Sequence, residues 1–436
     1  MKTLIVILIL AAAFNFLSAA PGDLLWKFPT ALSFNQYSPF LYNQLIFCST
    51  RNIYAINLDG TLEWCFKMNM NTYTSPCASD NIVISGNNFD EYIYACNATT
   101  GQLKWKKLLA ENSNNFWPII VSGKYFAPCC DRLVAINLSD GSTAWEVNES
   151  GFIFGSPTSW NNKIFAKASA GQNPAKMYSI DLSNGGIIWT YDFDTPIYSS
   201  PEVSDGIVYI GAEDKYVYAI NAENKSLVWR SLTISKFSFG KPCISNSKVF
   251  IAGCRDAILY SINTVNGEIL WQKQFTSYSQ PEIWSVPFAT DNTLYIGVKL
   301  YSDKPNIYAL NTEDGSVLWS YNTGKFVFSS PKVSNGVVYI GCNDTYLYAI
   351  ETYGYTGFKD ESSSYSLPAK SLSISPNPFS TRLSVSLPSS GAIYSLTGQL
   401  IMKLDKGKHS LYTSSWKQGV YIVKAGKECK RIVKIK

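Results

Sequence analysis

A Trp residue that returns about every 42 positions constrains the fold of this chain more than any other feature of its sequence. Each unit contains an alternating apolar strand, a short polar turn, a second strand close to Tyr-Ala-Ile-Asn, another turn and then the Trp. The repeated residues are Trp26, Trp64, Trp105, Trp145, Trp189, Trp229, Trp271 and Trp319. Helical repeats of this length would show an apolar period of about 3.6 residues, whereas the period here is two. The sequence therefore predicts an all-β propeller with short strands in each blade.

Gly and Pro residues mark fixed places in these units. Gly lies four residues before the Trp in most of them, and Lys225 takes that position in one unit. A tight turn that needs a positive φ angle explains this preference, because Gly adopts such angles without a steric penalty. Pro recurs 12 or 13 positions after most of the Trp residues, where it can begin a strand without removing a donor that the sheet needs.

The two ends of the repeat region have complementary gaps. The last unit has no Trp strand, because Gly357 and Phe358 occupy its place. The chain begins with an unpartnered strand, residues 24–28, that contains Trp26. We expect this strand to complete the last blade, which predicts an eight-bladed propeller over residues 21–358 with no open sheet edge.

The repeat resembles that of the quinoprotein, or PQQ-like, β-propeller family. The resemblance is carried by residues such as Ala55, Asn57, Gly60 and Trp64, and it covers residues 21–358. In that family each Trp docks against the neighbouring blade, which implies the same role for the repeated Trp residues here. The fold serves enzymes, scaffolds and binding proteins, so it does not settle the activity.

An enzyme interpretation would begin at Cys129, Cys130 and Asp131. Quinoprotein alcohol dehydrogenases hold PQQ beside a vicinal disulfide, with an Asp base and Ca²⁺, so the resemblance implies cofactor binding by Cys129 and Cys130 if the chain is such an enzyme. The family motif continues with Val-Asn-Arg-Gly, whereas this chain returns to the propeller repeat. Several other cysteines replace small apolar residues of the repeat, which indicates a core role. We expect no cofactor and no metal, with a PQQ-dependent dehydrogenase as the alternative.

The N-terminus has the pattern of a secretory signal peptide. Residues 1–20 contain Lys2, an apolar stretch and then small residues, which predicts cleavage after Ala20. No later segment reaches the roughly 18 consecutive apolar residues of a membrane helix, so we expect no transmembrane segment in the mature chain.

A second module follows a polar linker at residues 359–370. Residues 371–436 contain short alternating strands separated by Gly, Ser and Pro, which favour a small β-sandwich. Their order resembles the C-terminal sorting domain, type A-like, of type IX secretion, with the motif residues Pro376, Asn377, Pro378, Phe379, Gly398, Gly419 and Tyr421. The resemblance implies recognition by the type IX machinery and a location at the outer-membrane surface or outside the cell. The only His of the chain, His409, is expected in a solvent-facing turn.

Charge is divided unevenly between the two modules. The whole chain carries a net charge of +5. Residues 371–436 hold eleven basic and two acidic side chains, a balance of +9, which leaves −4 on the remainder. A mildly acidic propeller lacks the clustered positive charge that phosphate contacts need, so we expect no nucleic-acid partner.

No complete catalytic set of residues stands out, so the sequence favours an exported, non-enzymatic binding or scaffold protein. Its partner would be an envelope protein or a polysaccharide. Trp160, Trp284 and Tyr301 lie outside the repeated Trp position and are the candidate ligand anchors, near longer loops at 169–174 and 299–305. An outer-membrane assembly scaffold is a further alternative, because a lipoprotein of that kind has this fold. The absence of a Cys near the predicted cleavage site disfavours that alternative.

Overall fold

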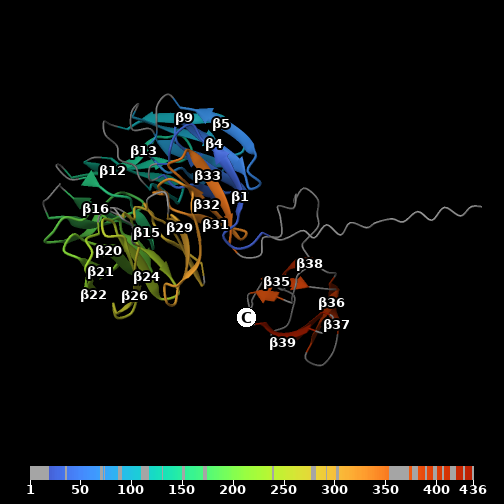
Figure 1. Cartoon of the computed structure of the whole chain (residues 1–436). Coiled ribbons are helices and arrows are strands. Elements are labelled where there is room, and N and C mark those ends of the chain that lie inside the picture. Colours follow the sequence, from blue (N-terminus) through green and yellow to red (C-terminus); the bar gives the residue numbers. More distant parts are fainter. Residues whose placement is uncertain are drawn as a thin grey trace, which may run out of the picture. The chain divides into compact units, whose positions relative to one another are not determined.

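The structure is a computed structural model of the chain (Figure 1). It describes residues 19–34, 37–68, 72, 74–86, 91–109, 117–129, 131–149, 153–169, 174–237, 240–275, 281–290, 292–300, 304–352, 373–375, 382–387, 390–395, 400–404, 407–412, 419–425 and 428–434. These residues belong to two compact units, one within 1–357 and the other within 358–436. No helix in the described ranges has the length and apolar character needed to cross a bilayer.

Eight antiparallel sheets account for the described strands of the first unit, and we number them as blades 1–8 in chain order. Blade 1 has β2 (Phe40–Tyr42), β3 (Leu45–Ser49), β4 (Asn52–Asn57) and β5 (Leu62–Lys67). Blade 2 has β6 (Cys77–Ser79), β7 (Ile82–Gly86), β8 (Tyr92–Asn97) and β9 (Leu103–Leu108). Blade 3 has β10 (Ile119–Val121), β11 (Lys124–Pro128), β12 (Arg132–Asn137) and β13 (Thr143–Asn148). Blade 4 has β14 (Ile153–Phe154), β15 (Thr158–Trp160), β16 (Lys163–Ser169), β17 (Lys176–Asp181) and β18 (Ile187–Asp192).

The other four blades follow the same order. Blade 5 has β19 (Glu202–Ser204), β20 (Ile207–Gly211), β21 (Tyr216–Asn221) and β22 (Leu227–Leu232). Blade 6 has β23 (Cys243–Ser245), β24 (Lys248–Gly253), β25 (Ile258–Asn263) and β26 (Ile269–Gln274). Blade 7 has β27 (Phe288–Ala289), β28 (Thr293–Gly297), β29 (Ile307–Asn311) and β30 (Val317–Tyr321). Blade 8 has β31 (Lys332–Ser334), β32 (Val337–Gly341), β33 (Tyr346–Glu351) and, from the start of the chain, β1 (Leu24–Pro29).

The first strands of neighbouring blades touch one another, which arranges the sheets around a common axis. These contacts run from β31 through β2 and β6 to β10, and from β15 through β19 and β23 to β27. The apolar cores lie between adjacent blades; one of them unites Cys77 and Ile84 of blade 2 with Tyr125 and Val134 of blade 3. Alternate strand residues supply these layers, as the apolar period of two predicts. The prediction of an all-β propeller is confirmed.

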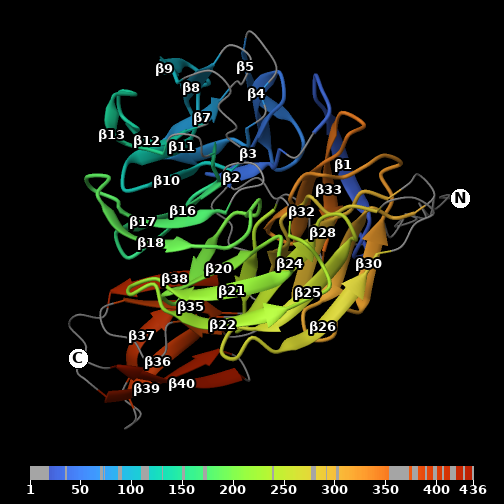
Figure 2. The same cartoon turned by 90° about the vertical axis from the view of Figure 1, so that its left-hand side faces the viewer.

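The N-terminal strand β1 completes blade 8. It pairs with β33 in antiparallel register, with Trp26 opposite Ala349, and both views show the two strands side by side (Figures 1 and 2). The Gly22 amide donates to the Glu351 carbonyl at 2.8 Å, and the Glu351 amide donates to the Asp23 carbonyl at 2.9 Å. The first and last strands of the propeller therefore close the ring, as the missing Trp strand of the last repeat predicts.

Each repeated Trp rests on a turn of the following blade. Seven indole N–H groups donate to a backbone carbonyl there at 2.8–3.2 Å, from Trp26 to Leu58, Trp64 to Ala98, Trp105 to Leu138, Trp145 to Leu182, Trp189 to Ala222, Trp229 to Thr264 and Trp271 to Thr312. The turn glycines have φ angles of +70° to +90°, and a Cβ on any of them would lie within 2.8 Å of the Trp ring: Gly60, Gly101, Gly141, Gly185, Gly267 and Gly315. Gly22 lies against Trp319 in the same way across the closure. The positive φ angle is confirmed, and contact with the Trp of the preceding blade is a second reason for Gly.

Two turn glycines separate the effect of φ from the effect of the Trp contact. Gly141 has a φ of +76°, and a Cβ there would lie 2.7 Å from Trp105. Gly123 has a φ of +69° with no atom within 4 Å of a Cβ. We expect Gly123→Ala to lower the free energy of unfolding by about 1–2 kcal/mol. Gly141→Ala will lower it by about 2–5 kcal/mol, because it adds overpacking to the same backbone strain.

Urea unfolding of the two variants measures this difference, and equal losses of unfolding free energy would show that the Trp contact contributes nothing.

Lys225 allows the opposite test, a substitution to Gly, because it occupies the turn position of blade 5 at a φ of +58°. The bond from Trp189 to this turn is the longest of the seven, at 3.2 Å. We expect Lys225→Gly to raise the free energy of unfolding by about 1 kcal/mol.

The second unit consists of two antiparallel sheets in its described residues. One contains β34 (Ser373–Ser375), β35 (Arg382–Leu387) and β38 (Gly407–Tyr412), and the other contains β37 (Leu400–Leu404), β36 (Gly391–Ser395), β39 (Gly419–Ala425) and β40 (Glu428–Lys434). Ile393, Tyr421 and Val423 are buried, as a small β-sandwich requires. The expectation of a turn at His409 is wrong, because this residue lies within β38 and pairs with Val385 of β35.

Candidate functional site

The propeller has two faces that differ in how the chain crosses them. On the turn face, tight turns such as Asp205-Gly206 join the first and second strands of a blade. On the loop face, at the opposite ends of these strands, longer segments lead from one blade to the next. Loops held on a rigid frame commonly carry binding residues, so the loop face is the first place to expect a ligand site.

A repeated aromatic position lies on the loop face, three residues before the Pro of each repeat. All four described residues at this position are aromatic, namely Phe154, Tyr198, Trp284 and Phe328. Phe154 is buried, whereas the other three are half-buried. Trp284 therefore belongs to a second repeated position that the Trp period did not reveal. The sequence signal was the recurrence of an aromatic residue at this distance from Pro.

A Ser directly follows each of the three half-buried side chains and anchors the segment. Ser285 Oγ accepts from the Gly297 amide at 3.1 Å, and Ser329 Oγ accepts from the amide at the end of β32 at 3.2 Å. Gly297 also leaves room for the following segment, because a Cβ there would lie 2.5 Å from Val327, next to Phe328. The half-buried aromatic side chains are thus carried by backbone that is bonded to the sheet.

Trp284, Phe326 and Phe328 form what we call the aromatic patch. The ring centres of Trp284 and Phe328 are 5.2 Å apart, and those of Phe326 and Phe328 are 6.1 Å apart. Lys299 Nζ lies 5.7 Å from the Phe326 ring centre and forms an ion pair with Glu282 at 3.0 Å. Half-exposed aromatic faces beside an ion pair suit contact with a macromolecule, because they combine apolar area with polar groups at the rim.

The three anchors suggested by the sequence do not share one described site. Trp284 lies on the loop face, whereas Trp160 ends β15 on the turn face and its ring packs against Gly206 of the next blade. Ser169, the last residue of β16 and the first of the predicted loop, lies at the opposite end of that strand from Trp160, about 20 Å away by strand length. Tyr301 and residues 170–173 lie outside the described residues.

Cys129 lies in the apolar core between blades 2 and 3. It is 2% exposed and packs in one cluster with Cys77, Ala127 and Val134. This position, enclosed by apolar side chains of two blades, does not fit contact with a cofactor. Cys130 lies outside the described residues. Among the residues that are described, no three His, Cys, Asp or Glu side chains gather in a metal-binding arrangement.

Five other cysteines are free thiols in buried positions, namely Cys48, Cys77, Cys96, Cys254 and Cys342. Burial raises the pKa of each of them, for example to about 12 for Cys342. Such thiols stay protonated and behave as small apolar core residues, as the repeat predicts.

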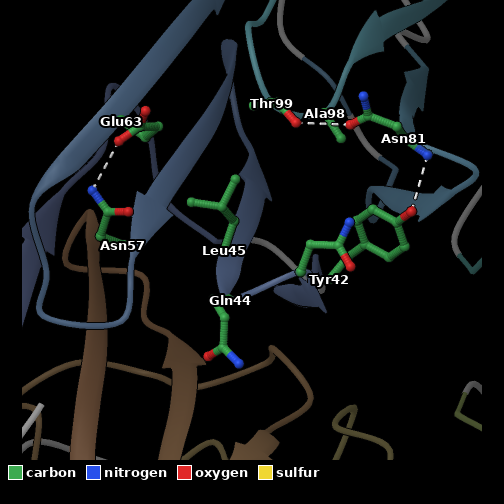
Figure 3. Close-up of a pocket in the computed structure, with 9 residues that line it drawn as sticks. Tyr42, Gln44, Leu45, Asn57, Glu63, Asn81, Ala98 and Thr99 are labelled. Atoms are coloured by element: carbon green, nitrogen blue, oxygen red, sulfur yellow. Dashed lines mark hydrogen bonds between the residues drawn. The ribbon is translucent and has the colours of Figure 1, made fainter. Parts of the chain in front are cut away.

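A pocket of about 250 Å³ lies on the turn face between blades 1 and 2 (Figure 3). Its walls are Tyr42, Asn43, Gln44, Leu45, Asn57, Glu63, Asn81, Ala98 and Thr99. Asn57 Nδ2 donates to Glu63 Oε2 at 3.1 Å. The Asn81 backbone N–H donates to the Tyr42 hydroxyl at 2.9 Å, and Asn81 Oδ1 accepts from the Thr99 hydroxyl at 2.9 Å. These bonds hold a carboxylate, a phenol and an amide in fixed places around the pocket.

Ion pairs span the equivalent position at two other blade interfaces. Lys248 of blade 6 pairs with Glu313 of blade 7 at 2.6 Å, and the same pairing recurs between blades 4 and 5. Between blades 1 and 2 the equivalent residues are Leu45 and Thr99, which cannot form an ion pair.

Comparisons with known proteins agree with the fold and the tail. Together, the propeller and the tail define a class of protein, an exported β-propeller of PQQ-like repeats with a C-terminal secretion-sorting domain. A family model described as outer membrane protein assembly factor BamB matches residues 131–282 and 255–356, just over half of the chain. The chain belongs to this family. A second model, described as a secretion system C-terminal sorting domain, matches residues 373–435.

The individual relatives are distant. Tetrathionate hydrolase of Acidithiobacillus ferrooxidans is 24% identical over 140 residues, which is 32% of this chain and 23% of that protein. BamB of Yersinia pestis is 25% identical over 154 residues, which is 32% of this chain and 38% of that protein. The chain thus spans about a quarter to two fifths of the length of these curated relatives.

Solved structures share the fold of the propeller. BamB from Moraxella catarrhalis superposes with a TM-score of 0.63 at 16% identity, covering 78% of this chain and 100% of that one. A europium-containing methanol dehydrogenase superposes with a TM-score of 0.62 at 12% identity, covering 76% and 93%. At these identities the likeness concerns the fold alone.

Proposed function

We propose that this chain is a non-enzymatic binding or scaffold protein of the cell envelope, displayed at the outer-membrane surface or released from the cell. Its ligand is an envelope protein or a polysaccharide. The sorting domain supports the location, and membership of the BamB family supports contact with other envelope proteins. A scaffold for outer-membrane assembly, as the names of these relatives suggest, is the related alternative.

We also propose that the propeller works without PQQ. The enclosed position of Cys129 supports this proposal, since its side chain packs with apolar residues of two blades. A PQQ-dependent dehydrogenase is the alternative, and it would need Cys130 and further residues to form a cofactor site elsewhere than at the Cys129 thiol.

The aromatic patch is the observation that carries the binding proposal. Trp284 and Phe328 occupy equivalent positions on adjacent blades and keep part of their rings exposed on a frame held by the serine bonds. Exposed aromatic side chains that are already ordered lose little conformational entropy when a partner covers them. Large rigid aromatic residues of this kind dominate the affinity of many protein interfaces.

Substitution of the patch tests this proposal. In a pull-down from envelope extract followed by titration of the captured protein, we expect Trp284→Ala and Phe328→Ala each to weaken binding by about 2 kcal/mol, or about thirtyfold. Leu108→Ala is the matched control, because this exposed apolar residue lies on the outer strand β9. Equal affinity of all three variants and the natural chain would contradict the assignment.

Trp160→Ala should lower the stability of the propeller rather than its affinity for a ligand, because Trp160 packs between blades.

A polysaccharide ligand is favoured by a different observation, the pocket between blades 1 and 2. The Tyr42 hydroxyl, the Glu63 carboxylate and the exposed Gln44 amide provide donors and acceptors together, which suits adjacent sugar hydroxyls. The volume of about 250 Å³ suits one sugar residue of a chain that continues outside the pocket.

A glycan array followed by titration tests the pocket. Loss of a charge-assisted hydrogen bond weakens binding by about 1.5–3 kcal/mol, so we expect Glu63→Gln to reduce the affinity for a captured glycan at least about tenfold. Glu268→Gln is the control, since Glu268 is exposed near the turn between β25 and β26 of blade 6. If both variants bind the glycan equally well, the glycan occupies another site.

A further inference from the structure

A layer of residues around the propeller axis contains charged groups that belong to neither the aromatic patch nor the pocket. It is formed at the position directly after the repeat Pro, where each blade begins its innermost strand. Its members are Phe40, Cys77, Ile119, Thr158, Glu202, Cys243, Phe288 and Lys332, and we call them the axial layer. Because the first strands of neighbouring blades touch, these side chains lie next to one another around the axis.

Contacts between blades link the polar side of the axial layer. The Thr158 hydroxyl of blade 4 donates to Glu202 Oε1 of blade 5 at 3.3 Å. The other oxygen of Glu202 forms an ion pair with Lys241, the residue before the Pro of blade 6. Lys332 Nζ of blade 8 lies 5.6 Å from the ring centre of Phe288 in blade 7. Side chains of five consecutive blades thus form one group beside the axis, and all of them except Phe288 are polar.

This group is largely withdrawn from bulk water. The side chains of Glu202 and Lys241 are 25% and 20% exposed, and Lys332 is partly buried. Burial, followed by the nearby charge of Lys241, lowers the pKa of Lys332. Burial also raises the pKa of Cys243 to about 11, so this thiol stays neutral. The charged members are therefore two lysines and one glutamate, with a net charge of +1.

Lys332 shares the charge of the Glu202 carboxylate with Lys241 and forms no ion pair of its own in the described part of the chain. The only carboxylate of the axial layer, Glu202, forms its ion pair with Lys241. The Phe288 ring face, 5.6 Å from Lys332 Nζ, and the charge of Glu202 both favour the charged form of Lys332, but Glu202 is shared with Lys241. Two partly buried ammonium groups that share one carboxylate leave one positive charge without an anion, which is unfavourable because hydration is lost without an equal gain.

We propose that Lys332 and Lys241 bind an anion at the propeller axis. The fitting ligand is a small carboxylate or inorganic oxyanion with a single negative charge, because one charge balances the group. Both ammonium groups donate hydrogen bonds to the anion, while Glu202 keeps Lys241 in position and Phe288 forms an apolar wall. This site is independent of the ligands proposed for the aromatic patch and the pocket.

Thermal unfolding of the full chain in increasing sodium acetate, with sodium HEPES holding the ionic strength constant, tests the proposal; a second series uses phosphate. We expect the Tm to rise and level off, by about 3–5 °C at about 100 times the Kd. Lys332→Met should abolish this rise. Without added anion, Lys332→Met should melt no lower than the natural chain, because it removes the positive charge that Glu202 does not balance.

Lys236→Met is the matched control, since Lys236 is 60% exposed and pairs with Glu213 at 3.6 Å away from the axis. It should keep the full response to acetate. The proposal is overturned if neither anion raises the Tm of the natural chain, or if Lys332→Met responds as the natural chain does. It is also overturned if Lys332→Met is destabilised in the absence of anion, because Lys332 would then be compensated within the protein.

Discussion

A chain that lacks residues 21–28 will not form a stable propeller. The deletion removes β1 and leaves the edge of β33 unpaired. It also removes Trp26 from its contacts with Leu58 and Gly60, and takes Gly22 away from Trp319. Trp26 is partly buried, and loss of a fully buried Trp destabilises by about 3–5 kcal/mol, so loss of the whole strand removes a large part of a total stability of roughly 5–15 kcal/mol. We expect circular dichroism to show a truncated protein that is largely unfolded at room temperature.

Lys27→Ala provides the control within the same strand. Lys27 is exposed, and its Nζ lies 4.3 Å from the ring centre of Tyr346. An exposed cation–π contact of this kind contributes about 0.5–1 kcal/mol, so the Tm should fall only slightly. A truncated protein with the full Tm would show that β1 does not close the ring.

Transfer of residues 371–436 to a reporter that carries a signal peptide will send the reporter to the cell surface in a host with type IX secretion. The expected change is all-or-none, because the sorting domain acts as an address that the export machinery reads. Protease accessibility on intact cells measures it. The reporter with the signal peptide alone should remain in the periplasm. Retention of the tailed reporter there as well would argue against the assignment of the tail.

Most of the fold could be predicted because the propeller repeats its chemistry. The spacing of Trp64, Trp105 and Trp145 indicates one blade per unit, and the unpartnered strand with Trp26 indicates the closure. Only one of the two reasons for Gly in these turns could be predicted from the sequence. A positive φ angle is a local property of the turn at Gly141, whereas its contact with Trp105 joins two blades and depends on how they pack.

The candidate sites were less accessible to prediction, because they join residues that are distant in sequence. Trp160 and Trp284 were grouped as extra aromatic residues, but one ends a strand on the turn face and the other precedes a strand on the loop face. The spacing to Pro could have identified the patch. No local signal brings Glu202 and Lys332 to the same axis, since their proximity follows from the closed ring.

The closure also determines when folding can finish. Trp26 and Ala349 are opposite each other in the sheet although more than three hundred positions separate them in the chain. Contacts of such sequence separation form slowly, because a long loop must close before they contribute any stability. In a chain that emerges from its N-terminus, the first strand stays unpaired until the last blade has emerged. During that interval the partial ring has two open edges, and this is the stage at which a chaperone would protect it from aggregation.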